Sequence, residues 1–351
     1  MSQLAKVFAL NREGFNLTRG LQITAAVIVT VGVVIAVDQE VYLLSVLFGL
    51  LFVALSDPGG GYADRLRPMA GVGLIGALLT GLGFGLGTDA WGWVVLAVFV
   101  VTLLCGLAVK YGLHNFVAGL LLNVWFVIAL SAASGYQQGH VTTHAWAQAL
   151  AWLIGAAAWI SLTFVAWLGR GRQAQPSHFP EIPGDTSPQP LTRPLILFAV
   201  IRAVALAIAV AIAFGFHLPN ADWMPIATLI AMKPSLEQSA LVAEQRLAGT
   251  LLGAALAAVF LLTLDNKHAL EVVIVILVAT AATIRGVNYA LYCTAAAALV
   301  LIAMDLPHPT NFTAEGQRVL FTLAGVGIAV AVMFLANLLQ KRTTPTAATT
   351  T

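Results

Sequence analysis

The feature that most constrains this chain is a series of long apolar runs, separated by short polar stretches, along almost its whole length. A membrane-spanning helix needs about 20 predominantly apolar residues, and breaking the sequence at its charges and turn residues gives twelve such runs. Charged residues make up only 9% of the chain, against about 25% in soluble domains. The sequence therefore predicts an all-α, polytopic membrane protein with twelve transmembrane helices.

The expected helices form two halves of six. A segment with six prolines at 170–194 separates them, and it is too polar and too rich in proline to span a membrane or to form a core. The expected spans are 21–37, 41–56, 69–87, 91–109, 115–133, 146–168, 195–214, 223–232, 247–264, 270–284, 289–304 and 319–339. The corresponding domains are a first membrane half at 1–168, a cytoplasmic linker at 169–194, a second membrane half at 195–340 and a disordered tail at 341–351.

A repeated polar segment indicates that the two halves are related. In residues 223–253 an apolar run ends at a Lys-Pro pair, a polar segment follows, and a small-residue helix restarts; residues 50–81 follow the same plan after an Asp-Pro pair. A shorter repeat is also present: Arg246, Thr250 and Gly253 have the same spacing as an Arg-Thr-Gly set that begins at Arg318. Three spans separate these copies, which is the arithmetic of an inverted three-helix repeat, although basic helix starts followed by small residues are common in any membrane bundle.

The distribution of charge predicts the orientation of the chain. Basic residues favour cytoplasmic loops, and an amino terminus inside the cell places most Lys and Arg residues on the cytoplasmic side and most acidic residues between spans on the outer side. Both termini are therefore expected to be cytoplasmic.

Arg202 is the clearest polar residue inside an expected span, about two turns from its start. A charge at mid-bilayer depth costs on the order of 3 kcal/mol, so it faces a partner or a wet cavity unless it snorkels to the interface. Arg202 either snorkels or lines, with Lys233 and Arg246, a vestibule that attracts anions. Asn123, central in its span, either bonds a neighbouring helix or a ligand.

These considerations give two sets of candidate residues. The expected substrate-binding residues are Arg202, Lys233, Arg246, Arg318 and Asn123. The expected structural or gating residues are Asp57, Arg67, Pro234, Glu244, Gly249, Thr250 and Gly253. Asp57 and Glu244 are expected to pair with nearby cations, with proton binding as the alternative, and most tryptophans, Trp223 included, are expected at an interfacial belt.

Several function classes lack their motifs in this sequence. There is no GxxxxGK[ST] phosphate loop, no HExxH zinc motif and no GxSxG nucleophile setting. His140 and His144 have no third ligand nearby. We therefore expect no enzyme activity, no metal and no cofactor. An anion leaving a negative-inside cell gains about 2.3 kcal/mol per charge per 100 mV, so basic residues alone could supply recognition.

At the polar segments just described, the chain resembles the fusaric acid resistance and aromatic acid exporter superfamily of bacterial inner-membrane proteins. The resemblance rests on 223–253, on the Asp-Pro-Gly-Gly segment followed by Arg65 and Arg67, on Arg202 and on the two-times-six layout. It implies an efflux permease for small organic acids in the bacterial inner membrane. The matching positions are Lys233, Pro234, Arg246, Gly249, Thr250 and Gly253.

One departure from the family pattern leaves the partners open. Better-known exporters of this type carry a substantial cytosolic domain, where this chain has only its Pro-rich linker, so a periplasmic adaptor is uncertain. The leading hypothesis is a secondary transporter exporting anionic, aromatic carboxylates, in contact with the lipid bilayer and not with nucleic acid, with a homo-oligomer left open. The alternatives are a potential-driven anion channel, like the distantly similar plant malate-type channels, and a non-transporting membrane scaffold.

Overall fold

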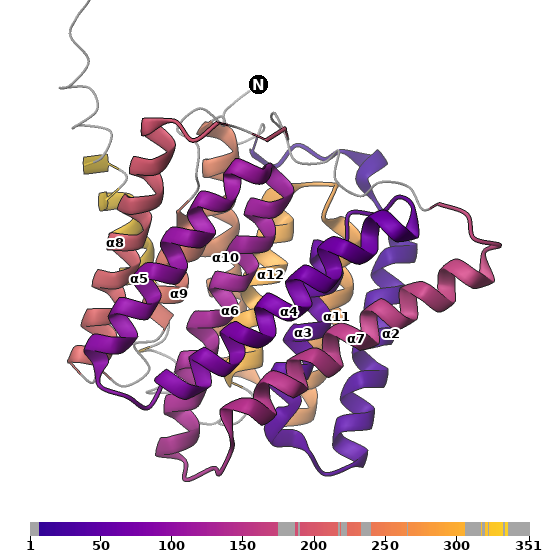
Figure 1. The fold of residues 1–351 in the computed structure, drawn as a ribbon, viewed down its shortest axis with the longest axis horizontal. Helices are drawn as coiled ribbons and strands as arrows, with labels where there is room; N and C mark the ends of the chain where they lie inside the picture. The colour runs from indigo at the N-terminus through magenta and orange to yellow at the C-terminus, as the bar shows by residue number, and fades with distance from the viewer. Residues whose placement is uncertain are drawn as a thin grey trace, which may run out of the picture.

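The computed structural model is a bundle of helices that run mostly up and down between two ends (Figure 1). It describes residues 7–174, 187–188, 190–216, 218, 223–232, 240–264, 266–305, 317, 320–321, 323–332 and 334–335. The helices are α2 (Leu17–Ala36), α3 (Leu43–Ser56), α4 (Tyr62–Leu86), α5 (Trp91–Leu107), α6 (Leu113–Gln138), α7 (Ala145–Gly169), α8 (Arg193–Gly215), α9 (Trp223–Ala231), α10 (Ala240–Thr263), α11 (Lys267–Ile284) and α12 (Tyr289–Asp305), with short 3-10 turns η1 (Arg12–Gly14), η2 (Glu40–Tyr42) and η3 (Ala108–Tyr111). A further helical segment spans Leu323–Val332.

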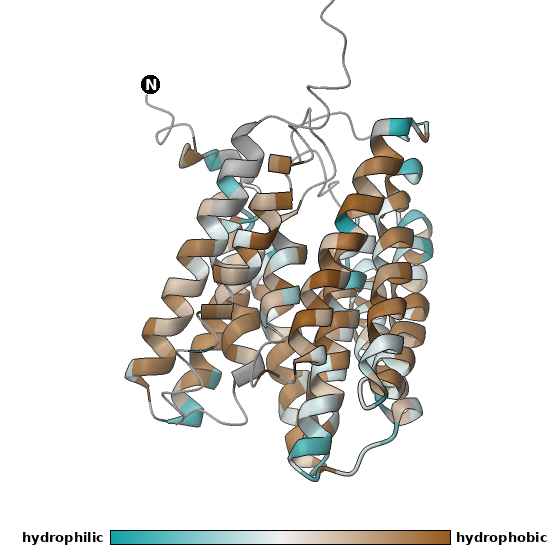
Figure 2. Ribbon diagram, turned by 90° about the vertical axis from the view of Figure 1, so that its left-hand side faces the viewer, coloured by the Kyte–Doolittle hydropathy of each residue, from teal (hydrophilic) through white to brown (hydrophobic). Residues whose placement is uncertain are grey.

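Seven of the described helices are long and apolar enough to cross a membrane: α2, α4, α5 with η3, α6, α7, α8 and α11. Shorter apolar helices occur at Glu40–Ser56, Ala248–Thr263, Tyr289–Ala303 and Leu323–Val332. Hydrophobic residues dominate the length of the helices and hydrophilic residues gather toward the two ends of the bundle (Figure 2). The chain is therefore a multi-pass helical membrane protein.

Two helices begin before the membrane spans expected from the sequence. The expected spans start at residues 69 and 247, whereas α4 begins at Tyr62 and α10 at Ala240. The polar stretches before the apolar runs are rich in Asp, Glu, Gln and Arg, and the last three are good helix formers. Charge there marks the point where each helix leaves the apolar layer, and the helix itself starts earlier.

Helices from the expected first and second halves pack against each other in a reciprocal pattern. The first helix of the first half, α2, packs on α11, and the first helix of the second half, α8, packs on α5. Both α5 and α11 are the fourth helix of their half. Small residues bring the pairs together, because a Cβ on Gly106 of α5 would lie 3.0 Å from the Cβ of Ala199 in α8.

Glycine also joins α10 to α12, which form the closest helix pair in the second half. A Cβ on Gly253 would lie 2.6 Å from the carbonyl oxygen of Thr294 and 2.7 Å from the Cβ of Ala297. Because the first of these neighbours is backbone, the helices must separate to admit a side chain. Gly249 meets the same helix one turn earlier, at Ala290 and Cys293. The predicted structural role of Gly249 and Gly253 is thus helix contact.

Gly253→Ala is expected to destabilise the protein by about 1–3 kcal/mol, the usual cost of overpacking. Thermal unfolding of the purified protein in detergent measures this. Gly85→Ala is the matched control, because a Cβ at Gly85 meets nothing within 4 Å. Equal melting temperatures for the two variants would contradict the close contact of α10 and α12.

Candidate functional site

Arg202 lies nine residues after the start of α8 and is completely buried. Its Cζ lies 5.5 Å from the centre of the Phe116 ring, near the start of α6. Ala199, Ala203 and Leu206 beside it on α8 are also fully buried. Arg202 therefore does not snorkel to the surface, and its charge is held between α8 and α6.

A second polar group follows on α6, two helical turns beyond Phe116. Asn123 is completely buried, and its Oδ1 accepts a hydrogen bond of 3.3 Å from the Thr102 hydroxyl of α5. Its Nδ2 has no hydrogen-bond partner among the residues that the structure describes. Since α6 packs on α5 and α5 packs on α8, the two predicted substrate-binding residues Arg202 and Asn123 belong to one three-helix region.

Asp57 and Arg65 form a buried, bidentate ion pair just beyond the end of α3. Arg65 Nε donates to Asp57 Oδ1 at 2.8 Å and Arg65 Nη2 to Asp57 Oδ2 at 2.5 Å. The side chains are only 1% and 2% exposed. Burial alone would raise the pKa of Asp57, but the hydrogen bond and charge of Arg65, with the Gly59 N–H and the charge of Arg19, hold the pKa below its ordinary 3.8. The predicted pairing role of Asp57 is confirmed.

Two more arginines bind the carbonyl groups at the end of α3. Arg19 Nη2 donates to the carbonyl oxygen of Ala54 at 2.8 Å, and Arg285 Nη1 to that of Leu55 at 2.8 Å. A helix C-terminus carries unsatisfied carbonyls and partial negative charge, so these contacts stabilise α3. We call the end of the bundle that holds Arg19, Arg65 and Arg285 the arginine end. The buried charged groups there, Arg19, Arg65 and Asp57, carry a net positive charge.

The amino-terminal segment is docked on the second half at the arginine end. Asn288 Nδ2 donates to the carbonyl oxygens of Val7 at 3.0 Å and Ala9 at 2.8 Å. The Asn11 N–H donates to Val287 O at 2.8 Å. The first residues described in the chain are thereby tied to the turn between α11 and α12.

Asn288→Ala is expected to loosen this docked segment, because it removes the amide that donates to both Val7 O and Ala9 O and leaves only the Gln245 Nε2 bond of 3.0 Å to Val7 O. The loss of two hydrogen bonds should increase the population of molecules whose amino-terminal segment is detached by roughly tenfold or more. Labelling of Val7→Cys, a position only 5% exposed, by a polar thiol reagent would measure this. Asn115→Ala, which removes an exposed amide, is the control, and unchanged labelling in Asn288→Ala would argue against docking through Asn288.

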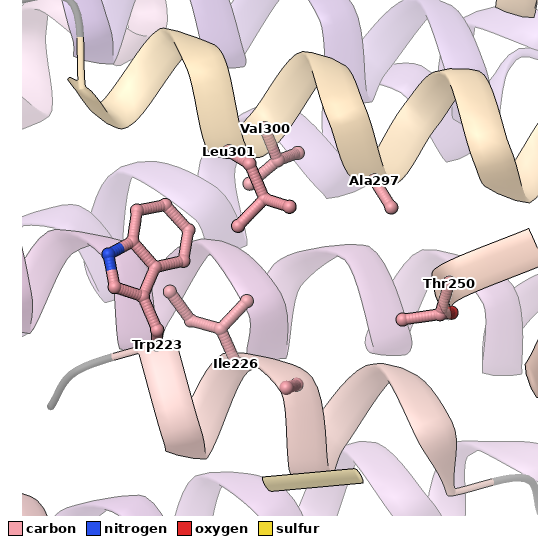
Figure 3. Close-up of a pocket in the computed structure, with 7 residues that line it drawn as sticks. Trp223, Ile226, Thr250, Ala297, Val300 and Leu301 are labelled. Atoms are coloured by element: carbon pink, nitrogen blue, oxygen red, sulfur yellow. The ribbon is translucent and has the colours of Figure 1, made fainter. Parts of the chain in front are cut away.

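A small cavity lies in the second half between α9, α10 and α12. Its volume is about 20 Å³, and its lining is Trp223, Ile226, Ala227, Thr250, Ala297, Val300 and Leu301. Figure 3 shows the Trp223 ring and Leu301 at one side and Thr250 at the other. The Thr250 hydroxyl is buried and has no hydrogen-bond partner among the described residues. Trp223, the first residue of α9, is 2% exposed.

Several predicted residues lie outside this description. Lys233, Pro234 and Arg318 are not among the described residues, nor are the side chains of Glu244 and Arg246 within α10. Arg67 is described and is exposed. The described residues include no cluster of three or more His, Cys, Asp or Glu side chains that could bind a metal.

The arrangement of the arginine end was not predicted from the sequence. Arg19 and Arg285 are among the basic residues expected on the cytoplasmic side, and the structure shows in addition that both bind the end of α3. Arg19 is 35 residues from its carbonyl partner and Arg285 is 230 residues from its own, so no local pattern could join them. The Asp57 to Arg65 spacing was the visible signal.

Comparison with known families concerns the part of the chain that holds the cavity. Residues 206–332 match the family model described as fusaric acid resistance protein-like. This part of the chain is therefore similar to the fusaric acid resistance protein-like family. The match covers α9 to α12 and the last part of α8, so Thr250, Gly249 and Gly253 fall inside it and Arg202 lies just before it. No curated protein and no solved structure matches the chain.

Proposed function

We propose that this chain is a secondary transporter that exports small organic anions, with aromatic carboxylates as the leading substrate class. The observation that carries the proposal is the completely buried Arg202 in an apolar helix of a multi-pass membrane protein. Buried intramembrane charge is costly and marks substrate or ion pathways. The family match supports a transporter class.

The groups around Arg202 suit a carboxylate. A guanidinium can donate two parallel hydrogen bonds to a carboxylate, and the Asn123 amide supplies a further donor two turns along α6. Phe116 offers a ring face beside the cation. Arg202 would bind the charge of the substrate, and Lys233, Arg246 and Arg318 would attract or guide it.

The proposed transporter has twelve helices in two related halves, with both termini on the cytoplasmic side of a bacterial inner membrane. The reciprocal packing of α2 on α11 and α8 on α5 supports this arrangement. Rocking between related halves is a common route to alternating access. The basic character of the arginine end fits a cytoplasmic location.

Flux of labelled benzoate into proteoliposomes tests the proposal. Saturable flux that unlabelled benzoate competes away supports a carrier. An ohmic current without saturation would identify an anion channel, and absence of flux for every anion offered would favour a membrane scaffold.

A further inference from the structure

We propose that the cavity between α9, α10 and α12 is the subsite for the apolar end of the carried anion, and that it selects substrates by size. This rests on the proposed function, with the charge of the substrate at Arg202. Residues of α9, α10 and α12 would then recognise the apolar end of the substrate.

The cavity combines empty space with an unused polar group. A water needs roughly 10–15 Å³ of such space, so the observed volume of about 20 Å³ admits one group of that size. The lining is apolar except for the Thr250 hydroxyl, which is 3% exposed. A buried hydroxyl without a protein partner costs about 1–3 kcal/mol, so a site that retains one gains by binding a water or ligand.

The walls of the cavity cannot close easily. Gly249 and Gly253 hold α10 against the backbone of α12 on either side of Thr250. The Thr228 hydroxyl of α9 donates to the carbonyl oxygen of Gly325 at 3.0 Å, which ties α9 to the last described helix. Helices α10 and α12 are therefore in close backbone contact, and α9 is held by the segment that contains Gly325.

The equivalent position in the first half, between α3, α4 and α6, is filled. Trp125 of α6 stacks on Phe48 of α3 with ring centres 5.3 Å apart, and its Nε1 donates to the Thr80 hydroxyl of α4 at 2.7 Å. Trp152 of α7 lies 4.8 Å from Trp125, and its Nε1 donates to Gly73 O at 3.0 Å. Each buried indole there has its hydrogen bond, whereas the α12 wall of the cavity consists of Ala297, Val300 and Leu301.

Helix α9 connects the cavity to the neighbourhood of Arg202. Trp223 and Ala227 line the cavity, and Ala231, one turn beyond Ala227, packs in the cluster that contains Ile201 and Ala205 of α8. Arg202 lies next to Ile201 in the sequence. Helix α9 therefore reaches from the cavity to the part of α8 that carries Arg202.

Competition by straight-chain carboxylates tests the size selection. Acetate, butyrate and hexanoate would compete with labelled benzoate in proteoliposomes of the full chain and of two variants. Ala297→Leu, which fills the cavity, is expected to weaken hexanoate about tenfold and acetate little, because a misfit of a methylene or two is worth roughly 1–3 kcal/mol. Val300→Ala, which enlarges it, is expected to shift the preference toward hexanoate. Ala255→Leu, at an exposed position of α10, is the matched control.

The outcomes separate this inference from the proposed function. If the unchanged chain shows no saturable benzoate flux, the proposed function fails. If it does, and both cavity variants keep the original order of affinities, the subsite is overturned. If Ala297→Leu does not fold, the test depends on Val300→Ala alone, and an unchanged preference for hexanoate in that variant overturns the subsite.

Thr250→Val gives an independent readout. Removing a hydroxyl that lacks a protein partner is expected to leave the melting temperature unchanged or raised, while benzoate affinity changes. Loss of stability together with unchanged affinity would return Thr250 to a purely packing role and would count against the subsite.

Discussion

Arg202→Met is expected to lower saturable anion flux by roughly 10- to 100-fold, because a hydrogen bond to a charged group contributes about 1.5–3 kcal/mol. The methionine side chain keeps much of the arginine's length and packs well in apolar surroundings. Replacing a buried charge by an apolar residue often leaves stability unchanged or raised, so abundance in the membrane should persist. Initial rates of benzoate uptake at matched protein levels measure the effect.

Arg193→Gln is the matched control for Arg202→Met. Arg193 begins the same helix and is exposed, so its loss should leave flux within about twofold, since surface charges contribute little. Full flux in Arg202→Met would refute the binding role. If Arg202→Met lowers both the flux and the amount of protein in the membrane, Arg202 stabilises the packing of α5, α6 and α8 and does not bind the substrate.

Asp57→Ala is expected to have the largest effect on stability. It leaves the Arg65 guanidinium buried without its carboxylate, and breaking a buried pair from one side costs about 3–5 kcal/mol. Thermal unfolding in detergent should show a large fall in melting temperature. Because the pKa of Asp57 is lowered, the pair stabilises the protein above the ordinary value of 3.8, and its contribution is lost only as the pH falls through the lowered pKa.

The double variant Asp57→Ala with Arg65→Met removes both charges and should recover much of the stability. If the loss of stability in the double variant equals the sum of the losses in the two single variants, the two side chains do not interact. Arg67→Met, at an exposed position two residues from Arg65, should be close to neutral.

The positions of the helices could be predicted well from the sequence, because apolar length is a direct signal in a membrane protein. The short run beginning at Trp223 is a helix of nine residues that ends at Ala231, one residue before its predicted end. The starts of α4 and α10 could not be placed, since polar residues continue a helix as readily as they end an apolar run.

The candidate site was predictable only in part. Arg202 and Asn123 were visible as isolated polar residues in apolar surroundings, and the structure brings them to neighbouring helices. The cavity was not predictable, because it depends on the space left between three helices and on the side chains Ala297, Val300 and Leu301 with which α12 faces it. The sequence singled out Thr250 for its spacing from Gly253, but only the structure shows that its hydroxyl has no hydrogen-bond partner among the described residues.

The reciprocal contacts of α2 with α11 and of α5 with α8 bear on how the protein is made. A ribosome delivers α2 long before α11 exists, so the first helix must wait in the lipid or against a temporary partner until residues 37–266 have followed it. The docking of the amino-terminal segment on Asn288 is delayed to the same moment. A first half expressed alone should therefore insert with exposed helix faces and be open to membrane proteases, and co-expression of the second half should protect it.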